Sequence, residues 1–271
     1  MKVVVKVAHP LLHPEGATPI APSAIVAKGQ TRTPQGMQPY VTPRALETDE
    51  IPLIINEFRV GAENAKSAGF DGVELHGAFG YIFDQFLQDN ANQRTDKYGG
   101  SIENRTRFML EVVDAVIQVW GTKKVGIKLS PSNTYNDMAD SNAIDTFGYA
   151  INALNNFDLA YLHLMEPTAA DLKHGGQNIP SVTFRSIYKG NLIVNSAYTK
   201  ETANAALASG NAELVSFGSL FLANPDLPER FRLNASLNQP DPSTFYAPQC
   251  DSPVDDCGFE KGYIDYPFLN Q

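Results

Sequence analysis

The sequence is poor in cysteine and in basic residues, and both shortages exclude classes of protein. Its 271 residues include two cysteines, Cys250 and Cys257, which argues against a disulfide scaffold and favours a reducing, cytoplasmic location. Lys and Arg number 21 against 30 Asp and Glu, a formal net charge of −9, so we expect no nucleic-acid partner. We expect no metal at the cysteine pair and leave open whether the two thiols pair.

Long apolar runs are also missing. No stretch approaches the roughly 20 consecutive apolar residues that a membrane-spanning helix needs, so we expect no membrane partner. Residues 1–7, MKVVVKV, are too short and too charged for a signal peptide. The composition leaves the oligomeric state open.

The sequence does contain an alternation of helical and strand-like segments. Apolar residues at helical spacing, with short continuous apolar runs between them, predict parallel strands covered by helices. The expected helices cover residues 49–68, 102–120, 143–155 and 199–209, and the expected strands cover residues 72–75, 125–129, 159–164, 192–195 and 213–218. This alternation is typical of an α/β barrel.

The expected strands end in polar or small residues, which is where an α/β barrel gathers its active site. These ends are His76, Ser130, Glu166, Ser196 and Gly218. No Gly-x-Gly-x-x-Gly follows any of the strands, which argues against a dinucleotide-binding fold.

The number of strands is too small for a closed barrel. Five are clear and residues 3–7 are a candidate sixth, whereas a barrel of this type has eight. Residues 8–50 are too rich in proline to supply two central strands. We therefore predict a TIM-type (β/α)8 barrel that is incomplete: a single domain over residues 1–271, truncated at its N-terminal side, with an open side.

Four motifs identify a family. They read HGAFGYIFDQFLQDNANQRTDKYGGSIENRTRF at 76–108, VGIKLSPSNTYNDM at 125–138, FLANPDLPERF at 221–231 and FEKGYIDYPFL at 259–269. The chain resembles the Old Yellow Enzyme family of FMN-dependent ene reductases, in the branch of N-ethylmaleimide reductases and oxophytodienoate reductases. The resemblance implies an FMN-binding barrel that takes hydride from NADPH or NADH. It also implies reduction of the activated C=C bond of a small α,β-unsaturated carbonyl or nitro compound.

The resemblance assigns the reaction to residues that follow the first expected strand. His76 matches the first of two donors that hold the substrate carbonyl oxygen, and such donors act as an oxyanion hole. Tyr81 matches the proton donor, since a phenol with an ordinary pKa of about 10 keeps its proton at pH 7. Phe79 stands at the second donor position, where a phenyl ring donates no hydrogen bond and narrows the pocket. The structural alternative for His76 and Tyr81 is that each is simply packed in the fold.

The resemblance also assigns residues around the flavin ring and the substrate. Lys128 replaces an arginine that approaches the ring, and it keeps the positive charge without the planar fork. Phe245 and Tyr246 match an aromatic pair that lines the far side of the substrate pocket.

The resemblance assigns binding of the FMN phosphate to four positions. Ser196 and Ala197 stand where the family has glycine-containing pairs whose amides hold the phosphate, and side chains there hinder close approach. Gly218 keeps the next glycine, and Ser219 replaces an arginine that pairs with the phosphate. The charged contact is therefore replaced by a neutral one.

Two interpretations of the chain stay open. The retained motifs favour an active FMN-dependent ene reductase. The missing front strands, together with Phe79 and Ser219, favour a truncated, non-catalytic barrel remnant with weak or no flavin binding. An aldolase or phosphate-binding barrel is disfavoured, because the resemblance already accounts for Lys128, the one lysine at a strand end near acidic residues.

Overall fold

The structure, a computed structural model, describes residues 7–13, 15–245 and 261–269. The chain forms two compact units. The first comprises residues 1–197 and 205–215, and the second comprises residues 198–204 and 216–271. The single domain over residues 1–271 stays a prediction.

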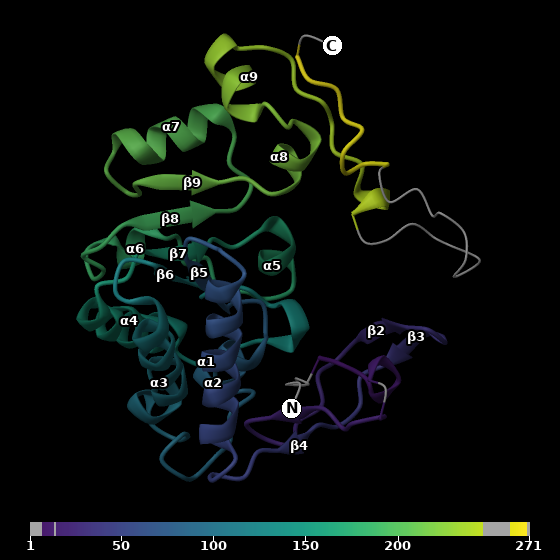
Figure 1. Cartoon of the computed structure of the whole chain (residues 1–271), viewed down its shortest axis with the longest axis vertical. Coiled ribbons are helices and arrows are strands. Elements are labelled where there is room, and N and C mark those ends of the chain that lie inside the picture. The colour runs from purple at the N-terminus through teal and green to yellow at the C-terminus, as the bar shows by residue number, and fades with distance from the viewer. Residues whose placement is uncertain (1–6, 14, 246–260, 270–271) are drawn as a thin grey trace. The chain divides into compact units, whose positions relative to one another are not determined.

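The first unit is built on a parallel sheet (Figure 1). Within the described residues its five strands are ordered β5-β6-β7-β8-β9. Their bounds are Val73–Gly77, Val125–Leu129, Tyr161–Met165, Leu192–Asn195 and Leu214–Ser216. The pairings from β5 to β8 are all parallel. The five expected strands are therefore confirmed, with ends shifted by up to a few residues.

Strand β5 forms an edge of this sheet in the described part of the chain, where β6 is its one neighbour. The N–H of Val73 bonds to the carbonyl of Lys124 at 3.0 Å. Because alternate residues of a parallel strand face opposite edges, the main-chain groups of Glu74 and His76 face the open side. The predicted incomplete barrel is confirmed at this edge. Residues 3–6 of the candidate sixth strand lie outside the described residues.

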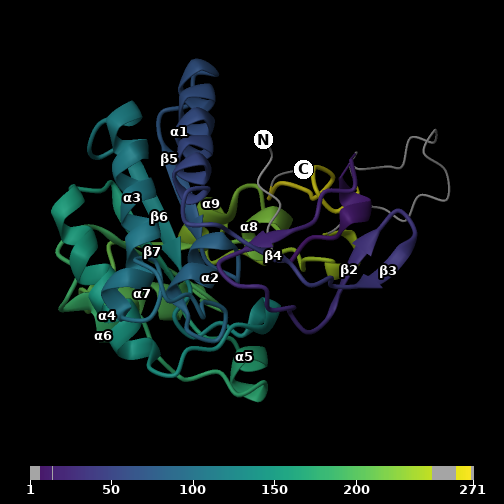
Figure 2. The same cartoon turned by 90° about the horizontal axis from the view of Figure 1, so that it is seen from below.

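The long helices pack against one another beside the sheet. Helix α1 (Ile51–Ser67) runs along α3 (Ile102–Trp120), and α3 contacts α4 (Ala143–Leu154), as Figure 2 shows. Each helix buries one apolar face, as the helical spacing predicts. Ser101 begins α3 by accepting a hydrogen bond from the N–H of Asn104 at 3.3 Å. These helices and α7 (Lys200–Ala208) confirm the expected helical segments.

Several short helices have no counterpart in the predicted pattern: α2 (Ile82–Leu87), α5 (Ala169–Lys173), α6 (Val182–Arg185), α8 (Ser219–Ala223) and α9 (Leu227–Leu233). Short 3-10 turns cover Pro10–Leu12, Tyr135–Asp137, Asn155–Phe157 and Pro242–Thr244. Helix α2 is buried on all sides. The Phe86 ring stacks on Phe108 at 4.3 Å between centroids, and Phe83 lies 5.5 Å from the same ring. Tertiary packing therefore holds α2, which has no exposed face to give a helical period of buried and exposed residues.

Residues 8–50 form an ordered excursion beside the sheet. Strands β2 (Gln30–Thr33) and β3 (Gly36–Pro39) make an antiparallel hairpin, and the two-residue strands β1 (Ile20–Ala21) and β4 (Arg44–Ala45) pair in parallel. Arg94 fastens the excursion by donating to the carbonyl oxygens of Pro22, at 3.0 Å, and Leu46. This agrees with the expectation that the stretch adds no barrel strand.

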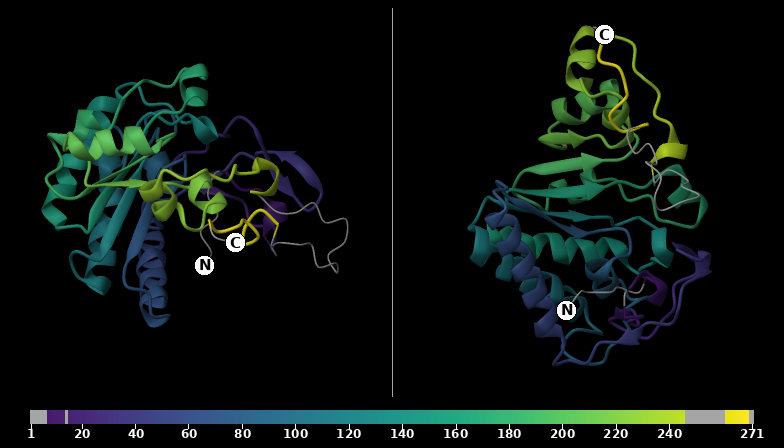
Figure 3. Two further views of the ribbon diagram at one scale, coloured as in Figure 1. Left: turned by 90° about the horizontal axis from the view of Figure 1, so that it is seen from above. Right: turned by 45° about the vertical axis from the view of Figure 1, so that its right-hand side comes forward.

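The second unit, drawn in green to yellow in Figure 3, contains a buried arginine, Arg230. Arg230 of α9 binds Asp226 at 2.6 Å and donates to the carbonyl oxygens of Ser236 and Pro267, both at 2.7 Å. This ties the last described segment to α9. Cys250, Cys257 and Tyr246 lie outside the described residues, so the predictions that fall on them stay untested. In the described ranges, no helix is long and apolar enough to cross a membrane.

Candidate active site

Polar side chains of four adjacent strands lie near one level of the sheet. The register places His76 of β5 beside Lys128 of β6, and Lys128 beside His163 of β7. Glu74 lies on the same face as His76, because side chains alternate along a strand with a period of two. Asn195, at the end of β8, accepts a hydrogen bond from Lys128 Nζ at 3.3 Å. One face of the sheet thus carries a row of groups that can bind or transfer protons.

His76, Phe79 and Tyr81 come together after β5. The ring centroids of His76 and Phe79 are 5.7 Å apart, and those of His76 and Tyr81 are 5.4 Å apart. Lys128 Nζ lies 5.4 Å from the centroid of the Phe79 ring, within cation–π range. Tyr81 is 37% exposed, so part of its side chain faces solvent. The structure therefore gathers these four predicted residues into one cluster.

Burial governs the protonation of this cluster. It lowers the pKa of His76, and the positive charge of Lys128 lowers that pKa further, so His76 is mainly neutral at pH 7. Burial also lowers the pKa of Lys128, although the Glu74 carboxylate acts in the opposite direction. A neutral imidazole can donate one hydrogen bond to a ligand without bringing a second positive charge next to Lys128.

Phe79 has an unusual backbone conformation. Its φ of 58° lies in the left-handed region, which bulky residues seldom adopt and which asparagine and histidine adopt more readily. Ser130 Oγ accepts a hydrogen bond from the Phe79 N–H at 2.9 Å, and Asn136 donates to the Phe79 carbonyl at 2.8 Å. The backbone at this position therefore suits asparagine or histidine better than phenylalanine.

Sequence reasoning missed a hydrogen-bonded pair next to the cluster. Glu74 Oε2 lies 2.9 Å from Nδ1 of His163. Burial acts to raise the pKa of Glu74, but the hydrogen bond and charge of His163 outweigh it, and the pKa falls. Burial, followed by the Glu74 carboxylate, raises the pKa of Tyr161 to about 12. The signal in the sequence was the polar residues that interrupt the apolar runs of β5 and β7.

A second missed group comes from the excursion. The Tyr40 hydroxyl donates to Asn136 Oδ1 at 3.3 Å. Burial, and after it the phenols of Tyr135 and Tyr81, raise the pKa of Tyr40. Tyr40 therefore belongs to the surroundings of Tyr81. No local pattern could have indicated this, because 96 positions separate Tyr40 from Asn136.

The residues predicted to hold the FMN phosphate fall into both units. In the first unit, Ser196 is half-buried and Ala197 is exposed, directly after β8. In the second unit, Gly218 and Ser219 are exposed at the start of α8. A Cβ added to Gly218 would meet no atom within 4 Å. These four assignments stay predictions.

The predicted aromatic pair is described in part. Phe245, in the second unit, is half-buried, and its carbonyl accepts a hydrogen bond from the hydroxyl of Tyr263. Tyr246 lies outside the described residues. The role of Phe245 toward a substrate therefore stays a prediction.

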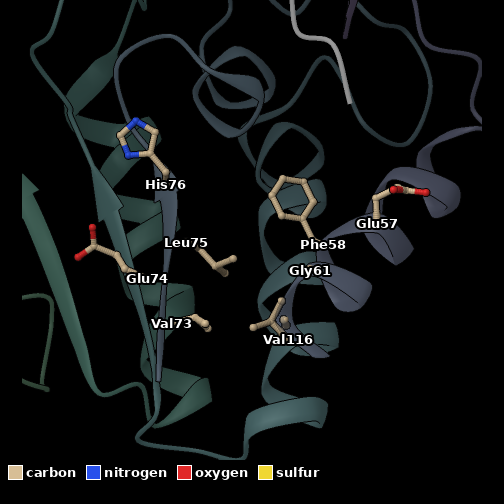
Figure 4. A pocket seen from close by; sticks show the side chains of 9 residues that line it. Glu57, Phe58, Gly61, Val73, Glu74, Leu75, His76 and Val116 are labelled. Atoms are coloured by element: carbon tan, nitrogen blue, oxygen red, sulfur yellow. The ribbon is translucent and has the colours of Figure 1, made fainter. Parts of the chain in front are cut away.

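A groove of about 470 Å³ opens between α1 and β5 (Figure 4). Val73 and Leu75 point toward α1, whereas Glu74 and His76 point away from it. The groove is lined by Glu57, Phe58, Gly61, Ala62, Val73, Glu74, Leu75, His76 and Val116. His76 is the one predicted site residue among them, so the groove marks the open edge of β5 rather than the centre of the cluster.

The fold and the cluster define an α/β-barrel enzyme whose reactive side chains lie at the carboxyl ends of parallel strands. Residues 8–238 match the model of the NADH:flavin oxidoreductase / NADH oxidase family. The chain belongs to this family.

Comparisons with known proteins agree with this assignment. The 12-oxophytodienoate reductase 1 of Oryza sativa subsp. japonica is 46% identical over 261 residues, which cover 95% of this chain and 65% of that protein. Morphinone reductase aligns with a TM-score of 0.89 and 45% identity, covering 99% of this chain and 71% of that one. The Old Yellow Enzyme homologue from Zymomonas mobilis gives a TM-score of 0.87 and 37% identity, covering 98% and 72%.

These likenesses confirm the predicted family and the predicted type of barrel. They agree with the predicted enzyme class, that of the NADH:flavin oxidoreductases; one of the similar structures is morphinone reductase in complex with tetrahydroNAD. The chain spans 65% of the 12-oxophytodienoate reductase and 71% of morphinone reductase. The activity and substrate of this particular chain are therefore a matter for proposal.

The donor set of the first unit fits the ring of FMN. Lys128 offers a cation near the end of β6 and Asn195 an amide at the end of β8, and both suit a polar, electron-accepting ring. The predicted phosphate residues are neutral. In the second unit, Arg230 is bound to Asp226 and Lys200 to Asn234. The residues predicted near the FMN ring therefore offer a charged donor, whereas those predicted near the phosphate do not.

Proposed function

We propose that this chain is an FMN-dependent ene reductase that uses NADPH or NADH to reduce the activated C=C bond of a small α,β-unsaturated carbonyl or nitro compound. The observation that carries the proposal is a chain of close contacts: the His76 ring lies 5.4 Å from the Tyr81 ring and 5.7 Å from the Phe79 ring, and Lys128 Nζ lies 5.4 Å from the centre of the Phe79 ring. Family membership supports the same reaction class.

His76 is the residue that would hold the substrate. Its neutral imidazole can donate to the substrate carbonyl oxygen, and it stabilises the negative charge that develops there during reduction. Phe79 stacks beside it with 28° between the ring planes. The phenyl ring forms an apolar wall that orients the alkene and excludes water.

Tyr81 is the residue that would move a proton. Its ring lies beside that of His76, so a substrate bound to His76 has the phenol close to its α-carbon. The Tyr81 O–H gives its proton to that carbon. FMN, when bound, supplies the hydride for the β-carbon. Lys128 would lie near the flavin ring, where its positive charge favours the more negative, reduced state.

A second candidate function is a barrel that binds little flavin and does not catalyse. Two features favour it: Phe79 donates no hydrogen bond, and Ser219 offers the phosphate a neutral donor. A lost oxyanion donor costs on the order of 10²–10³ in rate. The two candidates differ in flavin content and in turnover, so one preparation of protein distinguishes them.

The cellular location and the class of partner are inferred from composition. The low cysteine count favours the cytoplasm, and the net charge of −9 disfavours nucleic acid as a partner. Nothing in the site distinguishes NADPH from NADH, so both are tested.

The test is anaerobic turnover of 2-cyclohexenone and a nitroalkene by the purified chain, with excess FMN and either nicotinamide. We expect reduction of the enone, and a loss of about 10²–10⁴-fold in kcat for Tyr81→Phe. Tyr149→Phe makes the same change at an exposed tyrosine of α4 and should keep the wild-type rate. A chain that holds flavin and reduces neither compound overturns the proposal. A chain without flavin at saturating FMN supports the second candidate.

A further inference from the structure

The turn between β5 and α2 passes through two consecutive left-handed residues. Phe79 has a φ of 58° and Gly80 a φ of 73°. A Cβ at position 80 would come within 2.7 Å of the Asn136 Cβ and 2.9 Å of the Met138 Cγ, so the position accepts only glycine. Because His76 precedes this turn and Tyr81 follows it, the turn sets the spacing of the two proposed reactive groups.

Two buried side chains hold the N–H groups of this turn. The Phe79 N–H donates to Ser130 Oγ at 2.9 Å, and the Gly80 N–H donates to Asp84 Oδ2 at 2.8 Å. Ser130 Oγ is itself 3.5 Å from Asp84 Oδ2, a long hydrogen bond. Asp84 and Ser130 are both fully buried. We call this pair the turn clamp.

The carbonyl groups of the same two residues are also bonded to side chains. Asn136 donates to the Phe79 carbonyl at 2.8 Å, and Gln85 donates to the Gly80 carbonyl at 2.6 Å. Side chains therefore bind all four polar main-chain atoms of the turn. A left-handed pair that includes a phenylalanine persists only where its surroundings determine it strongly.

Asp84 is an unusual residue for a structural support. A buried carboxylate is costly unless it is hydrogen-bonded, and Asp84 gains a further bond from Gln88 at 2.6 Å. Burial raises the pKa of Asp84 to about 7. Asp140 acts on Asp84 in the same direction, and Asp140 is itself paired with Arg105 at 2.7 Å. An apolar residue at position 84 would avoid the cost but could not hold the turn.

We propose that Asp84 and Ser130 are positioning residues for the reaction, because they hold the turn between His76 and Tyr81 through its two N–H groups. The role in catalysis rests on the proposed function, whereas the clamp itself does not. The ionised carboxylate only accepts hydrogen bonds and holds the Gly80 N–H. The protonated form turns one oxygen into a donor and holds the turn less firmly.

Amide NMR of the 271-residue chain, labelled with ¹⁵N at Phe and Gly, tests the clamp without turnover. We expect the Gly80 signal to titrate with a midpoint close to pH 7, and the titration to vanish in Asp84→Asn. Ser130→Ala should displace the Phe79 signal and leave the Gly80 titration in place. A Gly80 signal that ignores pH in the wild type, or still titrates in Asp84→Asn, overturns the proposal.

Two control variants separate Asp84 from other titrating groups. Asp114→Asn makes the same change at an exposed position of α3, and His76→Gln removes the nearby imidazole. Both should leave the Gly80 midpoint unchanged. A midpoint that disappears in His76→Gln assigns the titration to His76 and overturns the role of Asp84.

Turnover at saturating FMN then tests positioning. We expect kcat for the enone to fall by roughly tenfold to a hundredfold in Ser130→Ala and Asp84→Asn, with the KM for the nicotinamide unchanged. The wild-type kcat should fall below about pH 7, and Asp84→Asn should lose that dependence. A wild-type kcat in Ser130→Ala, despite a displaced Phe79 signal, overturns the positioning role. Absence of turnover in the wild type, with the clamp intact by NMR, overturns the proposed function instead.

Discussion

The carboxyl end of β5 and the carboxyl ends of β8 and β9 are built in different ways. After β5, side chains bond every polar main-chain atom of the turn at Phe79 and Gly80, and the two supports of its N–H groups are fully buried. After β8 and β9, the residues predicted to hold the phosphate are neutral and lie closer to solvent. Ser196 is half-buried, and Ala197, Gly218 and Ser219 are exposed.

This difference shows how the two halves of the proposed site respond to substitution. At position 79 the side chain donates nothing, yet a buried network still fixes the main chain. At position 219 no packing constrains the residue, so a cation can be absent without cost to folding. We therefore expect the substrate half to be preorganised and the cofactor half to be limited by missing charge.

Among the changes that test this comparison, we expect Phe79→Asn to have the largest effect on the rate of reduction. Asparagine would restore a donor beside His76, and we expect enone reduction at saturating FMN to rise by up to about a hundredfold. Asparagine also tolerates the left-handed region, so the free energy of unfolding should rise by roughly 1 kcal/mol. Steady-state kinetics and urea unfolding measure the two effects.

The control is Phe79→Leu, which removes the ring but adds no donor. We expect no gain in rate and no relief of backbone strain. Equal rates for the asparagine and leucine variants would show that space, and not a hydrogen bond, limits the reaction at this position.

Ser219→Arg addresses the cofactor half. Hydrogen bonds to charged groups contribute about 1.5–3 kcal/mol, so one regained phosphate contact should lower the Kd for FMN by about tenfold to a hundredfold. Quenching of flavin fluorescence measures the Kd. Ser236→Arg adds the same charge at another exposed serine of the second unit. If both variants tighten binding equally, net charge and not a specific contact is responsible.

Much of the fold could be predicted because its signals are local. Continuous apolar runs predicted the parallel strands, and the helical spacing predicted α1, α3 and α4 to within a few residues. Helix α2 could not be found in this way. All six of its residues are buried, the polar Asp84 and Gln85 among them, so it has no exposed face and no alternation of apolar and polar residues at helical spacing.

The same distinction between local and long-range signals applies to the site. His76, Phe79, Tyr81 and Lys128 follow from contiguous motifs at strand ends, and the structure brings them together. The supporting contacts do not follow from motifs, because they join distant positions. His163 is 89 positions from Glu74, and only the strand register brings the two side chains to one face. The turn clamp likewise needs the β5-to-β6 pairing before its members can meet.

The smallest effect is expected from Glu74→Gln, which tests whether the bonded network extends beneath the turn. His163 holds the pKa of Glu74 below its ordinary value of 4.5 despite burial. The hydrogen-bonded Glu74 carboxylate therefore stabilises the folded chain above about pH 4.5, and this stabilisation is lost as the pH falls through the lowered pKa. The Glu74 side chain is 31% exposed, so solvent screens the pair.

We expect Glu74→Gln to lower the free energy of unfolding at pH 7 by less than about 1 kcal/mol, a deficit that shrinks on acidification. Urea unfolding across this pH range measures it, with Glu47→Gln as the same change at an exposed position. A deficit that is unchanged at acid pH would mean that Glu74 acts through packing, and the hydrogen-bonded network would then end at the turn.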